Sequence, residues 1–136
     1  MAVIAEAIRV EPNNSLSFGN YHVSEKIKIN EFNHDGDIYD LRTHDKITRL
    51  QKNGSLLIET VPGATLHNFG MDGKLVRFEI EGRGDAQITL ELEPNIEYKI
   101  FVDDMNIGSS TSKLSGKLIF SLSLNSNIQS VKIEKI

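Results

Sequence analysis

The side chains best suited to chemistry gather in one short stretch of the sequence. They are His34, Asp35, Asp37, Asp40, His44 and Asp45. Carboxylates could bind a hard cation such as calcium, and a histidine could act as a general base. The acids do not follow the Asp-x-Asp-x-Asp-Gly order of a calcium loop, and on a strand Asp37 and Asp40 point to opposite faces. We interpret the stretch as a solvated turn whose carboxylates accept hydrogen bonds from backbone amides, and we predict no metal ion and no cofactor.

The rest of the sequence shows no recognisable catalytic motif. The chain has four histidines, His22, His34, His44 and His67. They form no His-x-His pair and no His-Glu-x-x-His spacing, so any metal site would need convergence of separate strands. Cysteine is absent, and no Gly-x-Ser-x-Gly elbow is present. The sequence therefore predicts a protein that is not an enzyme. An enzyme with a site on the loop from His34 to Asp45 is the second alternative.

The elements that would position these side chains are predicted to be strands. Apolar side chains occupy every second position on both sides of Pro94 and Asn95, at Ile88, Leu90, Leu92, Tyr98, Ile100 and Val102. A period of two is typical of a strand with one buried face. Residues 117–124 alternate in the same way, and β-branched side chains favour a strand over residues 3–10.

Turn signals divide the remaining chain into short segments. Asp35-Gly36, Asn53-Gly54 and Asp72-Gly73 supply the positive φ that tight hairpins require. Residues 108–116, rich in Ser and Thr, are predicted to form a loop, and residues 82–85 a mobile turn. About ten short strands without a helix indicate an all-β protein, an antiparallel β-sandwich that is immunoglobulin-like or related. At 136 residues the chain fits a single domain, with a subdivision near residues 82–86 as the alternative.

The corner between the two central strands resembles a known family. Leu92-Glu-Pro94-Asn-Ile-Glu-Tyr98 is similar to the Leu-x-Pro-x-x-x-Tyr corner of fibronectin type III and related immunoglobulin-like modules. In that family the tyrosine hydroxyl bonds to upstream backbone and pins a corner between two sheets. Residues 86–136 also resemble the closing β-modules of bacterial carbohydrate-active enzymes. This resemblance implies a non-catalytic sandwich and names no ligand.

Composition argues against several classes of partner. The 15 basic and 19 acidic residues give a formal charge of −4 and are interspersed, so neither a nucleic-acid face nor a membrane face is predicted. The absence of tryptophan argues against a sugar site built on stacking. No apolar run approaches the roughly 20 residues needed to cross a bilayer, and residues 1–10 lack the basic region of a signal peptide. A cytoplasmic location is predicted, or export if further residues precede this chain.

Apolar side chains on the predicted outer faces of strands indicate self-association. They are Leu57, Leu75, Phe101, Ile119 and Ile136. If their strands share a sheet, these side chains form one patch, which a homo-oligomer such as a dimer would bury. The predicted function is therefore binding or self-assembly without catalysis, with a protein or a carbohydrate as ligand. A carbohydrate-binding accessory module is the first alternative.

Overall fold

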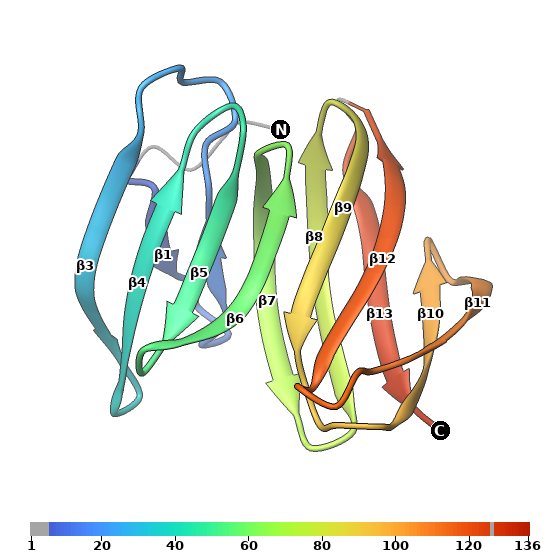
Figure 1. The fold of residues 1–136 in the computed structure, drawn as a ribbon. Helices are drawn as coiled ribbons and strands as arrows, with labels where there is room; N and C mark the ends of the chain where they lie inside the picture. The colour runs from blue at the N-terminus through green and yellow to red at the C-terminus, as the bar shows by residue number, and fades with distance from the viewer. Residues whose placement is uncertain (1–5, 126) are drawn as a thin grey trace.

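The computed structural model describes residues 6–125 and 127–136, which form thirteen strands and no helix (Figure 1). The strands are β1 (Ile8–Val10), β2 (Leu16–Phe18), β3 (Ile27–His34), β4 (Asp37–Thr43), β5 (Thr48–Lys52), β6 (Ser55–Val61), β7 (Ala64–Asp72), β8 (Leu75–Gly82), β9 (Gly84–Glu91), β10 (Glu97–Val102), β11 (Met105–Thr111), β12 (Lys117–Leu124) and β13 (Gln129–Lys135). The predicted all-β class is confirmed. Within the described residues, no helix is long and apolar enough to cross a membrane.

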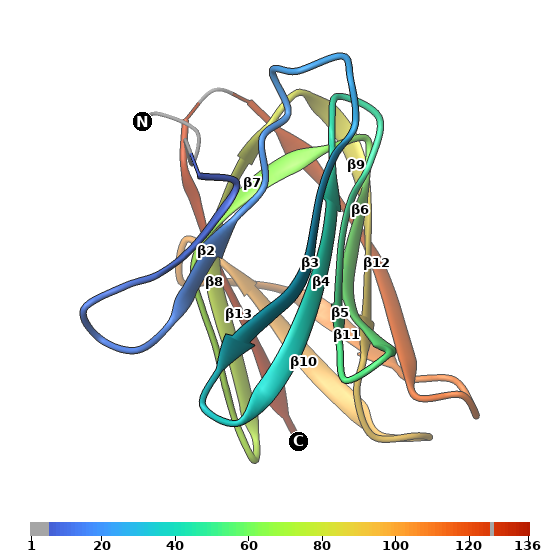
Figure 2. The same cartoon turned by 90° about the vertical axis from the view of Figure 1, so that its left-hand side faces the viewer.

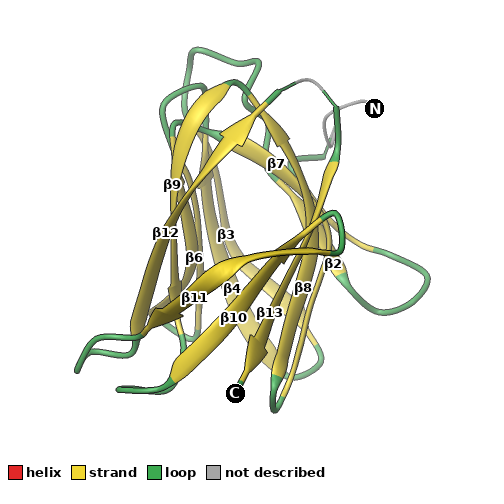
Figure 3. Ribbon diagram, turned by 90° about the vertical axis from the view of Figure 1, so that its right-hand side faces the viewer, coloured by secondary structure: helices red, strands yellow, loops and turns green. Residues whose placement is uncertain are grey.

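The strands form two antiparallel sheets that pack face to face, which confirms the predicted β-sandwich (Figure 2 and Figure 3). The seven-stranded sheet has the order β1-β2-β7-β8-β13-β10-β11, and the six-stranded sheet has the order β12-β9-β6-β5-β4-β3. Both halves of the chain contribute strands to both sheets. The pairing of β6 with β9 and that of β8 with β13 join residues on either side of the segment 82–86.

The core between the sheets is built from the apolar half of each alternating strand. In β12, Leu118 and Leu122 are buried as the alternation predicts. Phe69 is the centre of an aromatic cluster, because its ring lies edge-on to that of Phe18 at 5.9 Å and stacks on that of Phe78 at 5.8 Å. Each such side chain contributes about 1.5–3 kcal/mol when fully buried, so the closed interior provides the main stabilisation.

Two of the predicted hairpin turns form as their sequences require. Asp35 and Gly36 have φ of 51° and 81°, and Asn53 and Gly54 have φ of 51° and 83°. Two successive residues with positive φ match the right-handed twist of the strands they join. These turns connect β3 to β4 and β5 to β6, and thereby set the register within each of these two strand pairs.

Three segments differ from the prediction. Residues 108–111 belong to β11 and pair with β10, so they are not a loop. An edge strand exposed to water needs no apolar side chains, which is why its sequence predicted a loop. The predicted turn over residues 82–85 is shorter than expected, because β8 ends at Gly82 and β9 begins at Gly84, and the chain passes at Arg83 from one sheet to the other. Of the strand predicted over residues 3–10, β1 covers Ile8–Val10, and residues 3–5 lie outside the described part of the chain.

The corner after β9 carries the tyrosine hydrogen bond that its sequence predicted. The buried Tyr98 hydroxyl accepts the backbone N–H of Glu93 at 3.3 Å. Ser112, which the sequence did not single out, is also buried and holds the same corner from the other side. Its hydroxyl donates to the carbonyl of Glu93 and accepts the N–H of Ile96 at 3.0 Å. Two hydroxyls therefore satisfy backbone groups that the turn would otherwise leave unpaired.

Candidate functional site

The polar cluster predicted between residues 34 and 45 is divided among three places. His34, Asp35 and Asp37 line a cavity at one end of the sandwich. Asp40 lines a groove on the outer face of the six-stranded sheet. His44 and Asp45 lie beyond the far end of β4, roughly 20 Å away at the usual strand rise. The cluster is therefore not one site. Successive side chains of β4 point to opposite faces, and the length of β4 places its two ends far apart.

The cavity at the end of the sandwich has a volume of about 330 Å³ and lies where the β3–β4 turn approaches β2 and β7. His34 Nε2 is 3.0 Å from the carbonyl oxygen of Asn14. Asp37 accepts a hydrogen bond from Asn53 Nδ2 at 2.9 Å and lies 3.5 Å from Lys52 Nζ. The Asn53 bond, with a smaller contribution from Lys52, holds the pKa of Asp37 below its ordinary value. These side chains thus have local partners that fix the turn.

Tyr39 lies at the inner wall of the same cavity. Burial raises the pKa of the Tyr39 phenol, and the charges of Asp37 and Asp35 raise it further. The phenol is therefore a hydrogen-bond donor at neutral pH and does not act as a base. Within the described residues, no three His, Asp or Glu side chains lie close enough together to hold a metal ion.

A second concave region lies on the outer face of the six-stranded sheet, across β3, β4 and β5. Lys28 is directly opposite Arg42, and Arg42 is directly opposite Arg49. Paired residues point to the same face, with Cβ atoms about 5 Å apart, so these three basic side chains form a line that we call the cationic row. They line a groove of about 250 Å³ together with Asn30, Asp40, Leu41 and Gln51.

The charges of the cationic row are only partly neutralised. Glu59, opposite Arg49 on β6, has Oε2 3.8 Å from Arg49 Nη1. Across residues 6–125 and 127–136, no carboxylate lies within 4.0 Å of Lys28 or Arg42. The Nε of Arg49 is buried without a hydrogen-bond partner. Asp40 uses Oδ1 to accept the N–H of Glu31 at 3.0 Å. The groove is therefore a polar surface with an excess of positive charge.

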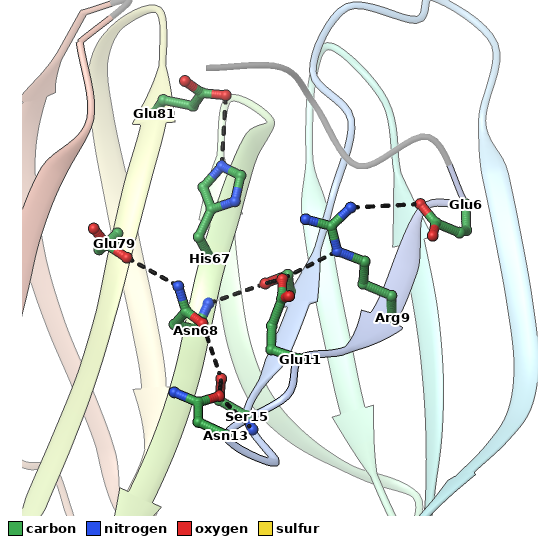
Figure 4. A network of polar contacts seen from close by, with 10 residues as sticks. Glu6, Arg9, Glu11, Asn13, Ser15, His67, Asn68, Glu79 and Glu81 are labelled. Atoms are coloured by element: carbon green, nitrogen blue, oxygen red, sulfur yellow. Dashed lines mark hydrogen bonds and ion pairs between the residues drawn. The ribbon is translucent and has the colours of Figure 1, made fainter.

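A buried pair on the other sheet escaped the sequence prediction (Figure 4). His67 on β7 and Glu81 on β8 are 2 % and 1 % exposed, and His67 Nε2 is 3.6 Å from Glu81 Oε1. Neither Glu81 oxygen has a hydrogen-bond partner among the described residues. Both side chains occupy outward positions of β7 and β8, where strand alternation alone would leave them exposed to solvent. Tyr21 lies beside Glu81, and its pKa is raised by burial and by the Glu81 charge.

A separate network of polar groups lies beside this pair and runs from Asn68 on β7 toward β1, as Figure 4 shows. The Ser17 hydroxyl accepts the N–H of Asn68 at 3.0 Å and donates to Glu11. Arg9 Nε donates to Glu11 at 3.0 Å. The bond from Ser17, with help from Arg9, lowers the pKa of Glu11. This network ties β1 and β2 to β7, which is a structural role.

The predicted apolar interface does not exist as one patch. Leu57 is 7 % exposed and belongs to the core, which contradicts its predicted outward position. The register between β5 and β6 shifts at this point, so Leu57 is the extra residue of a bulge. A bulge lets consecutive side chains point to the same side, and Leu57 and Ile58 are both buried.

The remaining four predicted interface residues lie on different sheets. Leu75 and Phe101 are half-buried in the seven-stranded sheet, whereas Ile119 is half-buried in β12 of the six-stranded sheet. Ile136 follows β13 and is 62 % exposed. The ring of Phe101 is covered by Lys132, whose Nζ lies 4.6 Å from the ring centroid. A single patch would require these strands to share one sheet, and they do not.

Searches against protein-family models, curated proteins and solved structures find no match to this chain. The resemblance to immunoglobulin-like modules stays a prediction.

Proposed function

We propose that this protein is a non-catalytic binding module that holds an acidic carbohydrate chain on the outer face of its six-stranded sheet. The observation that carries the proposal is the cationic row of Lys28, Arg42 and Arg49 along a polar groove. A ligand with regularly spaced negative charges would neutralise this row. The surface needs no reacting group, so the role is recognition.

The row is costly for the fold, which supports a role in binding. Like charges on directly opposite positions of a sheet are destabilising. Strands of ordinary sheets avoid this by alternating the sign of charge across the face, as Arg49 and Glu59 do. Arg77 and Lys132 also lie opposite each other on the other sheet, but the Lys132 ammonium lies over an aromatic ring. Local violations of favourable pairing are expected where a function needs them.

The remaining lining residues favour a hydroxyl-rich anion. Asn30 and Gln51 offer amide donors and acceptors, and the Asp40 carboxylate accepts hydrogen bonds from hydroxyl groups. Within the described part of the chain, the groove has no aromatic side chain to stack a nucleobase. An acidic sugar chain combines negative charge with hydroxyl groups and so fits this set of partners.

The resemblance of the corner supports the same role. The Tyr98 hydroxyl bond to Glu93 is the contact that the fibronectin-like comparison predicted. We infer from it a relation to immunoglobulin-like modules, which are scaffolds for recognition. The separation of His34 from His44 and Asp45 along β4 weighs against a catalytic site on that loop.

Calorimetric titration with polygalacturonate, a polyuronate, tests the proposal. We expect binding that weakens with salt, and no binding of the neutral glucan dextran. The double variant Arg42→Gln with Arg49→Gln should lose at least about tenfold in affinity, because each charge-assisted hydrogen bond contributes about 1.5–3 kcal/mol. The matched control is Arg77→Gln, an exposed arginine on the other sheet, which should bind normally.

Three results would overturn the proposal. One is an absence of polygalacturonate binding at low salt. Another is an equal loss of affinity in Arg77→Gln and in the double variant Arg42→Gln with Arg49→Gln, which would show that only the net charge of the protein matters. The third is equal or tighter binding of a duplex DNA of matched length, because that would show attraction to any polyanion.

A further inference from the structure

The free edge of β12 differs from the other three sheet edges. β1 is three residues long, which offers little to a pairing strand. β3 has a register shift between Ile29 and Phe32 and carries Lys28 near its start. β11 has a register shift opposite Ile100 and Phe101. Short length, bulges and lysines are the devices by which proteins prevent unwanted edge pairing.

β12 has none of these protections in its central part. It pairs with β9 over eight consecutive residues, Lys117 to Leu124, without a register shift. It contains no proline, and its single charge, Lys117, stands at its start. Ile119 and Phe120 are only half-buried. A regular, uncharged edge with incompletely covered apolar side chains is a template for another strand.

The hydrogen bonds of β12 show which groups are free. The N–H of Leu92 donates to the carbonyl of Gly116 at 2.7 Å, in line with the pairing of β9 and β12. Along an antiparallel pair of strands, residue pairs that exchange backbone hydrogen bonds alternate with pairs that do not. Residues 118, 120, 122 and 124 therefore bond to β9. Ile119, Ser121 and Ser123 direct their N–H and C=O groups away from the sheet.

We infer that two copies of this chain pair through β12 in antiparallel orientation about a twofold axis at Ser121. Ser121 would face Ser121 of the second copy, and Ile119 would face Ser123. The three residues of each copy supply three donors and three acceptors, which gives six hydrogen bonds. On the inner side, Phe120 would lie opposite Leu122, so the two cores become continuous.

A second copy fits this edge better than an unrelated strand for reasons of symmetry. The pairing brings no two charged side chains opposite each other, because Lys117 would face Asn125. The same strand is used by both copies, so the contact is self-complementary and closed. The protected edges at β1, β3 and β11 prevent further growth into a fibre.

Sedimentation velocity across the micromolar range tests this dimer. The wild-type chain should sediment as a dimer, and Ser121→Pro should sediment as a monomer. Proline removes the N–H that faces the partner and leaves the bonds to β9 in place. Ser121→Lys should act in the same way by placing two ammonium groups at the axis. Thr111→Lys, on the edge strand β11, is the control and should remain a dimer.

A cysteine variant tests the register. Across the twofold axis the two Cα atoms of residue 121 would lie about 5.5 Å apart, within the span of a disulfide. The chain has no cysteine, so Ser121→Cys should form a covalent dimer on oxidation, whereas Thr111→Cys should not. A wild-type monomer at all concentrations would overturn the inference, and so would a dimer that Ser121→Lys leaves intact. If Ser121→Pro fails to fold, the lysine and cysteine variants decide.

Discussion

Arg42 should destabilise the unliganded protein, and its replacement by glutamine should raise the free energy of unfolding. Arg42 has a like charge on both sides, Lys28 on β3 and Arg49 on β5. Each opposed pair costs about 0.2–1 kcal/mol. Because Lys28 and Arg42 are exposed and Arg49 is partly exposed, water screens their charges, and we expect Arg42→Gln to gain about 0.5–1 kcal/mol at low ionic strength.

Urea unfolding at low salt and at about 1 M salt, where the screening length is about 3 Å, measures this gain. The gain should nearly vanish at high salt. Lys99→Gln is the control, because Lys99 lies opposite Glu134 and its loss should lower stability slightly at low salt. The reasoning is refuted if Arg42→Gln is less stable than the wild type at low salt, or if its gain does not depend on salt.

Three further predictions concern the corner and the cavity. Ser112→Ala should cost about 1–3 kcal/mol, measured by urea unfolding, because it leaves the N–H of Ile96 and the carbonyl of Glu93 without a buried partner. Tyr98→Phe should cost less, about 0.5–1.5 kcal/mol, since its bond is 3.3 Å long and Glu93 is exposed; an unchanged midpoint would remove the pinning role. The lowered folded pKa of Asp37 adds stability above its unfolded pKa that is lost as pH falls through the folded value. Asp37→Asn should therefore flatten the acid side of the stability–pH curve, and a carboxyl that titrates by NMR at its ordinary value would contradict this.

Side-chain alternation and turn residues were sufficient to predict the all-β class and several of the strands and turns. The alternation of leucines in β12 predicts which side chains enter the core, because a strand has a period of two and one face must be dry. The Asn53-Gly54 turn predicts its hairpin, since both residues must adopt positive φ. The hydrogen bond of Tyr98 to the corner follows from spacing over seven residues. These features depend on neighbours in the chain.

The polar sites could not be predicted in the same way. Nearness in sequence predicted one cluster from His34 to Asp45, but an extended strand carries its ends apart and turns alternate side chains to opposite faces. Conversely, Lys28, Arg42 and Arg49 lie on three successive strands, β3, β4 and β5, and become neighbours only through the register in which these strands pair.

Strand alternation also fails to indicate which side chains are buried where a strand bulges or where its outer face is covered. Leu57 lies at a bulge, which reverses the face that counting by twos assigns to it. His67 and Glu81 occupy outward positions in their strands and are nevertheless buried.

The sequence by itself determined an all-β chain, its main turns, and the apolar side of its regular strands. Tertiary structure decided which strands lie at the edges, which charges meet across a face, and which outward side chains are covered. Alternation and turn geometry are set by the covalent chain and by a few adjacent dihedral angles. The order of strands in a sheet depends on pairings between residues far apart in sequence, which form only when the two sheets close over a common core.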